Sequence, residues 1–509
     1  MSKKLWIIGG LVLALIVAGS VTAVLLLTGG DDDERADPKP TAESDVPEGL
    51  EEYYTQELDW EDCGSDRCAD ITVPIDYAEP DGDTTELRMR VVGDEDAEQH
   101  LFVNPGGPGG SAVDYATTMS FQLGGDVTDT YAIVGVDPRG VGVSSPLDCY
   151  DDEQFDAYVD TDPTPDDPAE VQASIDQLEG MAQACEKNSG DLAAHVSTVE
   201  VARDMDIARA LVGDDKLNWF GASYGTYLGA TYASLFPEKV GRMVLDGAIN
   251  PELGPVDSAL GQTTGFQRAL EAYIDDCVTD ADCPLGTDAA AAQQRLADLL
   301  TQLDAQPMPT DASDRPLTEG QAFFGIALPL YSETLWSELT DALTLAIGEG
   351  DGSGLQFLSD AYFERSEDGS YGSNIGQVIT AVNCLDATER PTFEELEADV
   401  AEFVAVSPVF GRALGLGAGA CSAWPFESEA DPVDFSAKGA PPILVLGTTR
   451  DPATPYEQAV ELADLLDSGV LISRDGDGHT AYQSGNECVT DAVDAYLVDG
   501  TVPKKDPEC

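Results

Sequence analysis

A serine placed between two glycines is the residue whose surroundings point most clearly to chemistry. Ser223 lies in the run Gly-Ala-Ser-Tyr-Gly at residues 221–225, after the apolar residues 217–220 and before residues 226–236, which have helical character. A strand that turns sharply into a helix crowds the backbone at the turn, and the flanking glycines relieve this crowding. The pattern therefore predicts a nucleophilic serine at the tip of a strand–turn–helix unit.

A serine hydroxyl needs a base to become a nucleophile near neutral pH, and the chain has only three histidines. His479 follows the last apolar run of the chain, in a predicted loop that also holds Asp475 and Asp477, which we interpret as solvated loop residues. His100 is expected at a strand end and His195 at the entry of a helix. His479 is therefore the predicted general base, with a solvated loop histidine as the alternative.

The third residue of such a site is a carboxylate that orients the imidazole. Asp451 comes just after the buried-strand run at residues 443–446, and 479 − 451 = 28 residues separate it from His479. That gap leaves room for one helix and one strand. Asp246, which follows the strand predicted at residues 243–245, is the rival acid. We predict Asp451 as the catalytic acid.

Acyl transfer also needs hydrogen-bond donors for the developing oxyanion. A glycine-rich loop, Asn-Pro-Gly-Gly-Pro-Gly-Gly at residues 104–110, follows the strand predicted at residues 101–103. A phosphate-binding loop is disfavoured, because no Gly-Lys-Ser/Thr follows and prolines lack a backbone donor. The predicted oxyanion donors are the N–H groups of Gly107 and Tyr224.

The chain order serine, aspartate, histidine is that of the α/β-hydrolase fold, a mostly parallel central sheet flanked by helices. We expect the core in two parts, residues 56–250 and 436–509. Between them, residues 251–435 are predicted to form a mainly helical lid over the active site. Helical patterns within this insertion cover residues 289–303, 335–347 and 393–404.

Three stretches of the sequence resemble a known family. They are residues 104–110, residues 136–144 (Val-Asp-Pro-Arg-Gly-Val-Gly-Val-Ser) and residues 221–226 (Gly-Ala-Ser-Tyr-Gly-Thr). They are similar to the bacterial secreted tripeptidyl aminopeptidases, prolyl-aminopeptidase-like serine peptidases of the α/β-hydrolase fold. The resemblance covers nearly the whole chain from about residue 55. Pro105 stands where prolyl aminopeptidases proper have histidine, which favours the tripeptidyl branch.

The resemblance implies an exopeptidase that removes short peptides, often tripeptides, from free N-termini, with Ser223, Asp451 and His479 as catalytic residues. An aminopeptidase needs a negative group for the substrate ammonium. Asp386, two residues after Cys384, is the candidate, with a helix-capping or surface aspartate as the alternative. A lipase or esterase of the same fold and a catalytically silent binding module are the other functions that we keep open.

The N-terminal residues indicate export. Lys3 and Lys4 precede residues 5–28, an uncharged and mostly apolar stretch long enough to span a bilayer. We expect residues 1–30 to be a signal peptide or an uncleaved membrane anchor with the body outside the cytoplasm. The acidic, proline-containing residues 31–55 are expected to be a solvated linker.

The cysteine content agrees with an oxidising compartment. The chain has ten cysteines, with no spacing typical of a metal site, so neither a metal nor another cofactor is expected. Connectivity cannot be read from sequence, but pairing of cysteines that are neighbours along the chain suggests five bridges: Cys63–Cys68, Cys149–Cys185, Cys277–Cys283, Cys384–Cys421 and Cys488–Cys509.

The charge balance is extreme, with 25 basic and 96 acidic residues and a net charge of −71. A nucleic-acid partner is excluded, because binding to phosphates needs positive charge. Because 42% of the residues are hydrophobic, the chain is expected to fold. We interpret the charge as an adaptation to high salt, with a simple acidic bias of an exported protein as the alternative.

Overall fold

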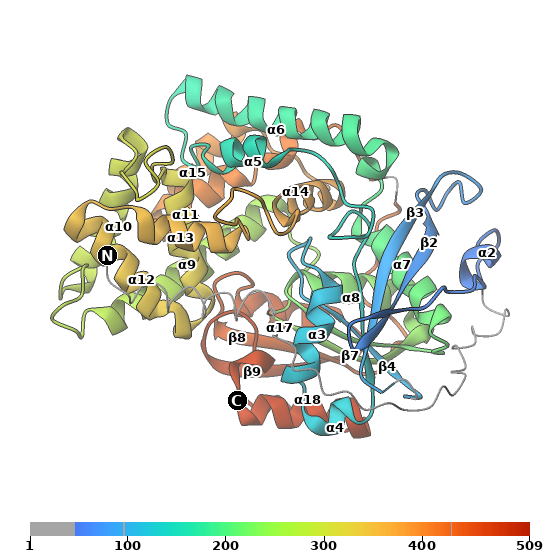
Figure 1. Cartoon of the computed structure of the whole chain (residues 1–509). Coiled ribbons are helices and arrows are strands. Elements are labelled where there is room, and N and C mark those ends of the chain that lie inside the picture. Colours follow the sequence, from blue (N-terminus) through green and yellow to red (C-terminus); the bar gives the residue numbers. More distant parts are fainter. Residues whose placement is uncertain (1–45, 95–96, 429) are drawn as a thin grey trace.

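The computed structural model describes residues 46–94, 97–428 and 430–509 (Figure 1). The predicted signal or anchor, residues 1–30, lies outside these residues, as do residues 31–45 of the predicted linker. The linker's last residues differ from the expectation, because they form a short helix, α2 (Glu51–Tyr54), with Tyr53 and Tyr54 buried. The Tyr54 hydroxyl donates to Asp206 at 2.6 Å, which attaches this helix to the core. Within the described ranges, no helix combines the length and apolar character needed to cross a membrane.

A central sheet runs through the described chain in the order β1-β2-β3-β5-β4-β6-β7-β8-β9. The pairs from β5–β4 to β8–β9 are parallel, whereas β1, β2 and β3 join at one edge in antiparallel pairing. Its strands are β1 (Glu61–Cys63), β2 (Asp66–Pro74), β3 (Thr84–Val92), β4 (His100–Asn104), β5 (Ala132–Val136), β6 (Leu217–Ala222), β7 (Val240–Asp246), β8 (Ile443–Arg450) and β9 (Gly469–Asp477). This mostly parallel sheet confirms the predicted α/β-hydrolase fold class.

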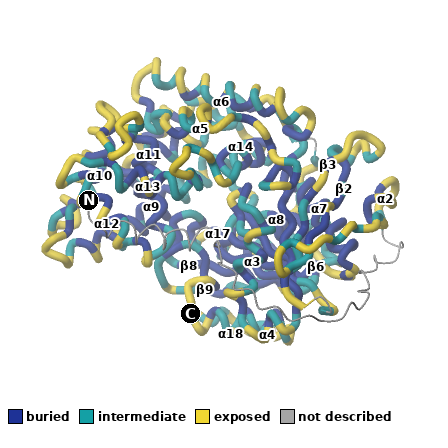
Figure 2. The backbone as a smooth tube through the Cα atoms, viewed as in Figure 1, coloured by how far each residue is buried: buried dark blue, intermediate teal, exposed yellow. Residues whose placement is uncertain are grey.

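Both faces of the parallel strands are buried, as apolar runs in such strands predict. In β8, Ile443 and Val445 join the core that holds α7, α8 and α17, whereas Leu444 and Leu446 join the core on the opposite face with α3 and α18. The helices on these faces are α3 (Ala112–Gln122), α4 (Gly125–Thr128), α7 (Thr198–Leu211), α8 (Tyr224–Leu235), α17 (Tyr456–Leu465) and α18 (Glu487–Asp499). Figure 2 shows the buried backbone gathered in the sheet and these helices.

Between β7 and β8 the chain leaves the sheet and forms a set of helices, which we call the helical segment (Figure 1). Its helices are α9 (Pro255–Cys277), α10 (Ala289–Ala305), α11 (Glu319–Ala327), η4 (Leu328–Tyr331), α12 (Trp336–Leu343), α13 (Ser353–Tyr362), α14 (Ile375–Asp386), α15 (Phe393–Val406) and α16 (Gly411–Gly417). The three helices predicted inside the insertion correspond to α10, α12 and α15. The segment has an apolar core of its own, in which Leu296, Ile326 and Leu339 are fully buried.

Two further helices, α5 (Asp152–Val159) and α6 (Pro168–Ser189), lie above the sheet near α14 and α15, although they precede β6 in the chain (Figure 1). Neither helix was predicted from the sequence. Their signals were capping boxes, in which Asp151 caps α5 with Gln154, and Asp167 caps α6 with Glu170. The layer above the sheet is therefore built from two separate parts of the chain.

Five disulfides join all ten cysteines in the pairs expected from their order along the chain: Cys63–Cys68, Cys149–Cys185, Cys277–Cys283, Cys384–Cys421 and Cys488–Cys509. Cys149–Cys185 links the chain before α5 to the end of α6, and Cys384–Cys421 closes the region around α14 and α15. The bridges thus hold the layer above the sheet as well as the chain's C-terminal end.

Candidate active site

Ser223 lies at the turn between β6 and α8, as the motif predicts. Its backbone has φ 54° and ψ −123°, a strained conformation for a residue with a side chain. The adjacent glycines are required by close packing, because a Cβ on Gly221 would lie 2.1 Å from the Gly225 carbonyl and one on Gly225 would lie 2.7 Å from the Asn104 carbonyl. The Ser223 amide donates to the Asp246 carbonyl at 2.9 Å. This geometry is the strained turn that exposes a nucleophilic serine.

His479 and Asp451 are brought together from the ends of two neighbouring strands, β9 and β8. His479 Nδ1 lies 2.9 Å from both carboxylate oxygens of Asp451. Asp451 is fully buried and also accepts hydrogen bonds from the backbone N–H groups of Ala453, Thr454 and Thr480. An ionised carboxylate with this many donors is held in one orientation, so it can fix the imidazole tautomer.

The electrostatics of this pair favour a basic imidazole. Burial by itself lowers the pKa of His479, but the carboxylates of Asp451 and, more weakly, Asp246 outweigh it and leave the pKa raised above its usual value. Thr454, which was not predicted as a site residue, adds a side-chain contact, with Oγ1 3.1 Å from Asp451 and 3.3 Å from His479 Nδ1. Its position three residues after the acid, in Asp-Pro-Ala-Thr, was the available signal.

Asp246, the rival acid, contacts the histidine loop instead of the imidazole. Its carboxylate accepts hydrogen bonds from the backbone N–H groups of Ala481 at 2.7 Å and Tyr482 at 2.9 Å. The side chain is fully buried, and burial raises its pKa to about 6 in spite of these two donors. Asp246 therefore holds the backbone just after His479, whereas Asp451 holds the ring.

The loop before His479 is more ordered than the sequence suggested. Asp475 and Asp477, expected as solvated loop residues, lie at the end of β9 and form ion pairs with Arg450 of β8 at 2.9 Å and 2.7 Å. These ion pairs continue the β8–β9 pairing beyond a register shift after Thr448. The expected solvation holds for Asp475, whose side chain is 80% exposed, whereas Asp477 is partly buried. The ion pairs with Arg450 were not predicted, because this cationic partner lies on the neighbouring strand.

The glycine-rich loop after β4 packs directly on the serine turn. A Cβ on Gly106 would lie 2.6 Å from the Ala222 carbonyl and 2.8 Å from the Tyr224 nitrogen, so only glycine fits there. Among the described residues, neither the N–H of Gly107 nor that of Tyr224, the first residue of α8, donates to a protein acceptor. Both N–H groups are therefore available to a ligand, as an oxyanion hole requires.

The other two histidines lie elsewhere. His100 Nδ1 is 3.0 Å from Asp214, and His195 Nδ1 is 2.8 Å from Glu200. Neither is among the described residues that line the cavity containing Ser223 and His479. That cavity has a volume of about 2460 Å³ and is bounded by the serine turn, the glycine-rich loop, α5, α6 and the helical segment.

Asp386, the candidate for binding a substrate ammonium, lines the same cavity at the end of α14. Its carboxylate accepts hydrogen bonds from the Thr198 amide at 3.0 Å and the Thr198 hydroxyl at 2.5 Å, and this hydroxyl also lies 2.6 Å from the Tyr224 hydroxyl. Burial raises the pKa of Asp386 to about 7, although the two bonds from Thr198 lower it. A nearby cation would favour the ionised form of this carboxyl.

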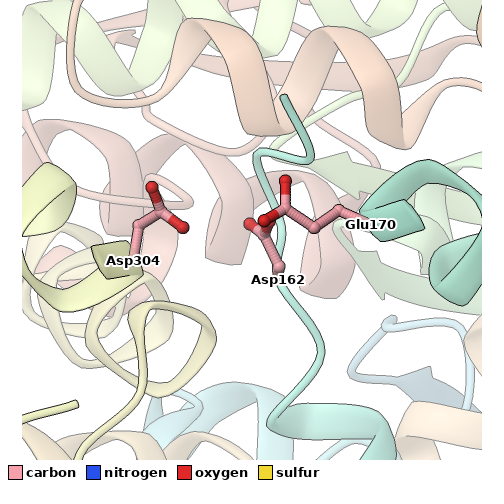
Figure 3. Close-up of side chains that lie close together, drawn as sticks. All are labelled: Asp162, Glu170 and Asp304. Carbon is pink, nitrogen blue, oxygen red and sulfur yellow. The ribbon is translucent and has the colours of Figure 1, made fainter. Parts of the chain in front are cut away.

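One group of carboxylates has the spacing of a cation site. Asp162, Glu170 and Asp304 each place an oxygen within 4.8 Å of the others, with Asp162 beside Glu170 and Asp304 facing them (Figure 3). Carboxylate oxygens suit a hard cation such as Ca²⁺. Asp304 is exposed, however, and exposed acidic groups are abundant in this chain, so the cluster alone does not define a metal centre.

Fold and site together define a serine hydrolase of the α/β-hydrolase fold. A family model described as TAP-like protein matches residues 407–509. Among solved structures, a proline iminopeptidase from Mycobacterium smegmatis is 14% identical and aligns with a TM-score of 0.35, covering 84% of this chain and 98% of that one.

Curated relatives match over most of the chain. "Serine protease Hip1" of Mycobacterium tuberculosis is 36% identical over 481 residues, 89% of this chain and 91% of that protein. "Tripeptidyl aminopeptidase" of Streptomyces lividans is 32% identical over 469 residues, 89% of this chain and 86% of that protein. "Carboxylesterase B" of Mycobacterium tuberculosis is 37% identical over 459 residues, 87% and 86% of the two chains. The chain belongs to the tripeptidyl aminopeptidase family of α/β-hydrolase serine peptidases, which confirms the predicted family.

Proposed function

We propose that this protein is an extracytoplasmic serine exopeptidase that releases short peptides, in particular tripeptides, from free N-termini. The observation that carries the proposal is the 2.9 Å contact between His479 and Asp451 in the cavity that also exposes Ser223, beneath the helical segment. A complete set of nucleophile, base, acid and free backbone donors argues against a silent binding module.

In the proposed mechanism, Ser223 Oγ attacks the scissile carbonyl while His479 Nε2 accepts the hydroxyl proton. Asp451 holds the opposite ring nitrogen and stabilises the imidazolium that forms. The backbone N–H groups of Gly107 and Tyr224 stabilise the oxyanion. The imidazolium then protonates the leaving amine, and a water molecule activated by His479 hydrolyses the acyl-enzyme.

Selectivity for the ends of peptide chains would follow from the layer of helices that covers the active-site cavity. The cavity is lined by the serine turn and by the helices α5, α6 and α14, and we propose that these helices block a long chain from passing through. Asp386 is the proposed partner of the substrate ammonium, because it is a partly buried carboxylate in this cavity beside Thr198. A buried carboxylate that pairs with a substrate charge discriminates against substrates without that charge.

The proposed location is an oxidising compartment outside the cytoplasm, where the enzyme is either secreted or membrane-anchored. Its support is the pairing of all ten cysteines in disulfides, which form and persist outside the reducing cytosol. The apolar residues 5–28 would supply the export signal or anchor. Separating membrane from soluble fractions of the native host, and sequencing the mature N-terminus, distinguishes the two forms.

The proposed activity is tested with chromogenic dipeptides and tripeptides, each free and N-acetylated, beside short acyl esters. Faster release from free tripeptides than from dipeptides or capped tripeptides supports the proposal. Equal rates on free and capped peptides would indicate an endopeptidase. Turnover of esters without peptides would indicate the esterase function that one relative's name suggests. No turnover of any substrate by folded protein would indicate a binding module.

A further inference from the structure

The helical segment contacts the histidine loop directly at η4. The backbone N–H of His479 donates to the Tyr331 carbonyl at 2.9 Å. The two rings also meet, with centroids 5.4 Å apart and planes at 87°. The approach is close, because a Cβ on Gly478 would lie 2.8 Å from the same carbonyl. The predicted base is therefore held by a residue that lies outside the sheet and its flanking helices.

Packing contacts within the helical segment fix the position of Tyr331. Its ring packs against Phe266 of α9 with centroids 6.0 Å apart, and Leu328 and Leu330 of η4 are buried in the core of the helical segment. Burial and then the neighbouring Tyr362 raise the pKa of Tyr331 well above its usual value, so the phenol stays neutral. Tyr331 therefore acts on His479 through shape and backbone hydrogen bonding, without a charge of its own.

The catalytic role of an imidazole makes such a contact important. Asp451 holds only Nδ1, and a ring held at one atom can still tilt and move Nε2 away from the serine hydroxyl. A displacement of about 1 Å in an active site can cost on the order of 10²-fold in rate. A ring packed at a right angle to the imidazole restricts that tilt, and the bond from the His479 amide fixes the backbone to which the ring is attached.

We propose that Tyr331 is a positioning residue for His479, so that the base is complete only when the helical segment is seated on the sheet. The inference rests on the proposed Ser-His-Asp mechanism. In this arrangement the helical segment does more than restrict access to the cavity, because it also supplies the ring contact that limits tilting of the imidazole.

The test compares Tyr331→Leu, Tyr331→Ala and Tyr331→Phe with the parent on a tripeptidyl substrate. Tyr331→Leu keeps an apolar side chain at this partly buried position on the cavity wall, so it remains informative if Tyr331→Ala fails to fold. We expect Tyr331→Leu to lower kcat by about 10- to 100-fold with a much smaller change in KM, because the ring no longer limits tilting. Tyr331→Phe keeps the ring and is expected to rescue kcat.

The matched control is Tyr273→Leu, in the same helical segment. Tyr273 is fully buried, packs on Trp336 and bonds Thr340, and is not among the described residues that line the cavity. The Tyr273→Leu variant therefore measures the effect of destabilising the helical segment while the contacts of His479 stay unchanged. We expect its kcat to stay close to that of the parent at temperatures where it remains folded.

A spectroscopic measurement separates positioning from a merely structural role. With three histidines in the chain, the imidazole Nδ1–H signals in proton NMR can be assigned by comparison with His479→Ala. We expect the His479 signal to broaden or vanish in Tyr331→Leu and to persist in Tyr331→Phe and Tyr273→Leu. Full kcat and an unchanged His479 signal in folded Tyr331→Leu would overturn the inference, as would an equal loss in Tyr273→Leu. Substantial activity of Ser223→Ala would instead overturn the proposed function.

Discussion

The backbone amide of Ser223 donates a hydrogen bond of 2.9 Å to the carbonyl of Asp246, the last residue of β7. The carboxylate of the same aspartate accepts from the backbone of Ala481 and Tyr482, just after His479. One residue thus joins the turn of the predicted nucleophile to the loop of the predicted base. Catalysis requires a fixed separation between these two groups, so we assign Asp246 a structural role between them.

The first prediction concerns the nucleophile and the base. Ser223→Ala is expected to lower kcat by on the order of 10⁶ while the protein stays folded, because the acyl-enzyme cannot form. His479→Ala is expected to give a similar loss. Steady-state kinetics on a free tripeptidyl substrate, with circular dichroism to verify folding, measure both. His100→Ala and His195→Ala are the controls, and an equal loss in all three histidine variants would contradict the assignment.

The second prediction separates the two buried aspartates. Asp451→Asn is expected to lower kcat by about 10⁴, because an amide favours the wrong imidazole tautomer. Asp246→Asn is expected to change kcat mildly but to reduce the free energy of unfolding by about 1–3 kcal/mol, since an amide oxygen replaces only one of two buried acceptors. Steady-state kinetics and urea unfolding of both variants measure these effects. A severe loss of kcat in Asp246→Asn would show that Asp246, at the end of β7, is the catalytic acid.

The third prediction concerns pH. The base must be neutral to accept a proton, so kcat/KM rises as pH increases through the pKa of His479. Burial lowers that pKa, but Asp451 outweighs burial and raises it, so the midpoint of the acid limb is expected above 6.5, the usual histidine value. In Asp451→Asn the midpoint should move to lower pH, because the main cause of the increase is removed. A midpoint that stays in place would show that another group titrates.

The fourth prediction tests substrate charge. An N-acetyl cap leaves the Asp386 carboxylate unpaired and is expected to lower kcat/KM on the order of 10²-fold or more, and Asp386→Asn should remove most of this difference. Because burial raises the pKa of Asp386 to about 7, the carboxylate ionises across neutral pH. Discrimination in the parent should therefore increase from pH 6 toward pH 7.5 and decrease above about pH 8, where the substrate α-amino group loses its charge. Discrimination that persists in Asp386→Asn would move the role to another acid of the cavity.

The fifth prediction follows from the net charge of −71. Repulsion among surface carboxylates is screened over about 10 Å at 0.1 M salt and about 3 Å at 1 M. The free energy of unfolding is therefore expected to rise from 0.1 M to 2 M KCl, with activity retained. Urea unfolding across the salt series measures it. Stability that falls steadily with salt would favour a plain acidic bias over adaptation to high salt.

Local patterns were sufficient to predict the strand–turn–helix around Ser223, the glycine-rich loop and the positions of Asp451 and His479 after strands. These features depend on neighbours in sequence, because strand ends, tight turns and glycine-only conformations leave a short-range signature. The helices α10, α12 and α15 were predictable for the same reason, since their apolar residues repeat with the helical period.

The tertiary structure decided the contacts between residues far apart in the chain. It divided the roles of Asp246 and Asp451, which have the same local pattern, by placing one carboxylate against the loop backbone and the other against the imidazole. It also brought Arg450 to Asp477 and Tyr331 to His479. The sequence by itself determined which groups could react, whereas strand order and helix packing decided which of them meet, because a pairwise contact across the fold has no signature in either local sequence alone.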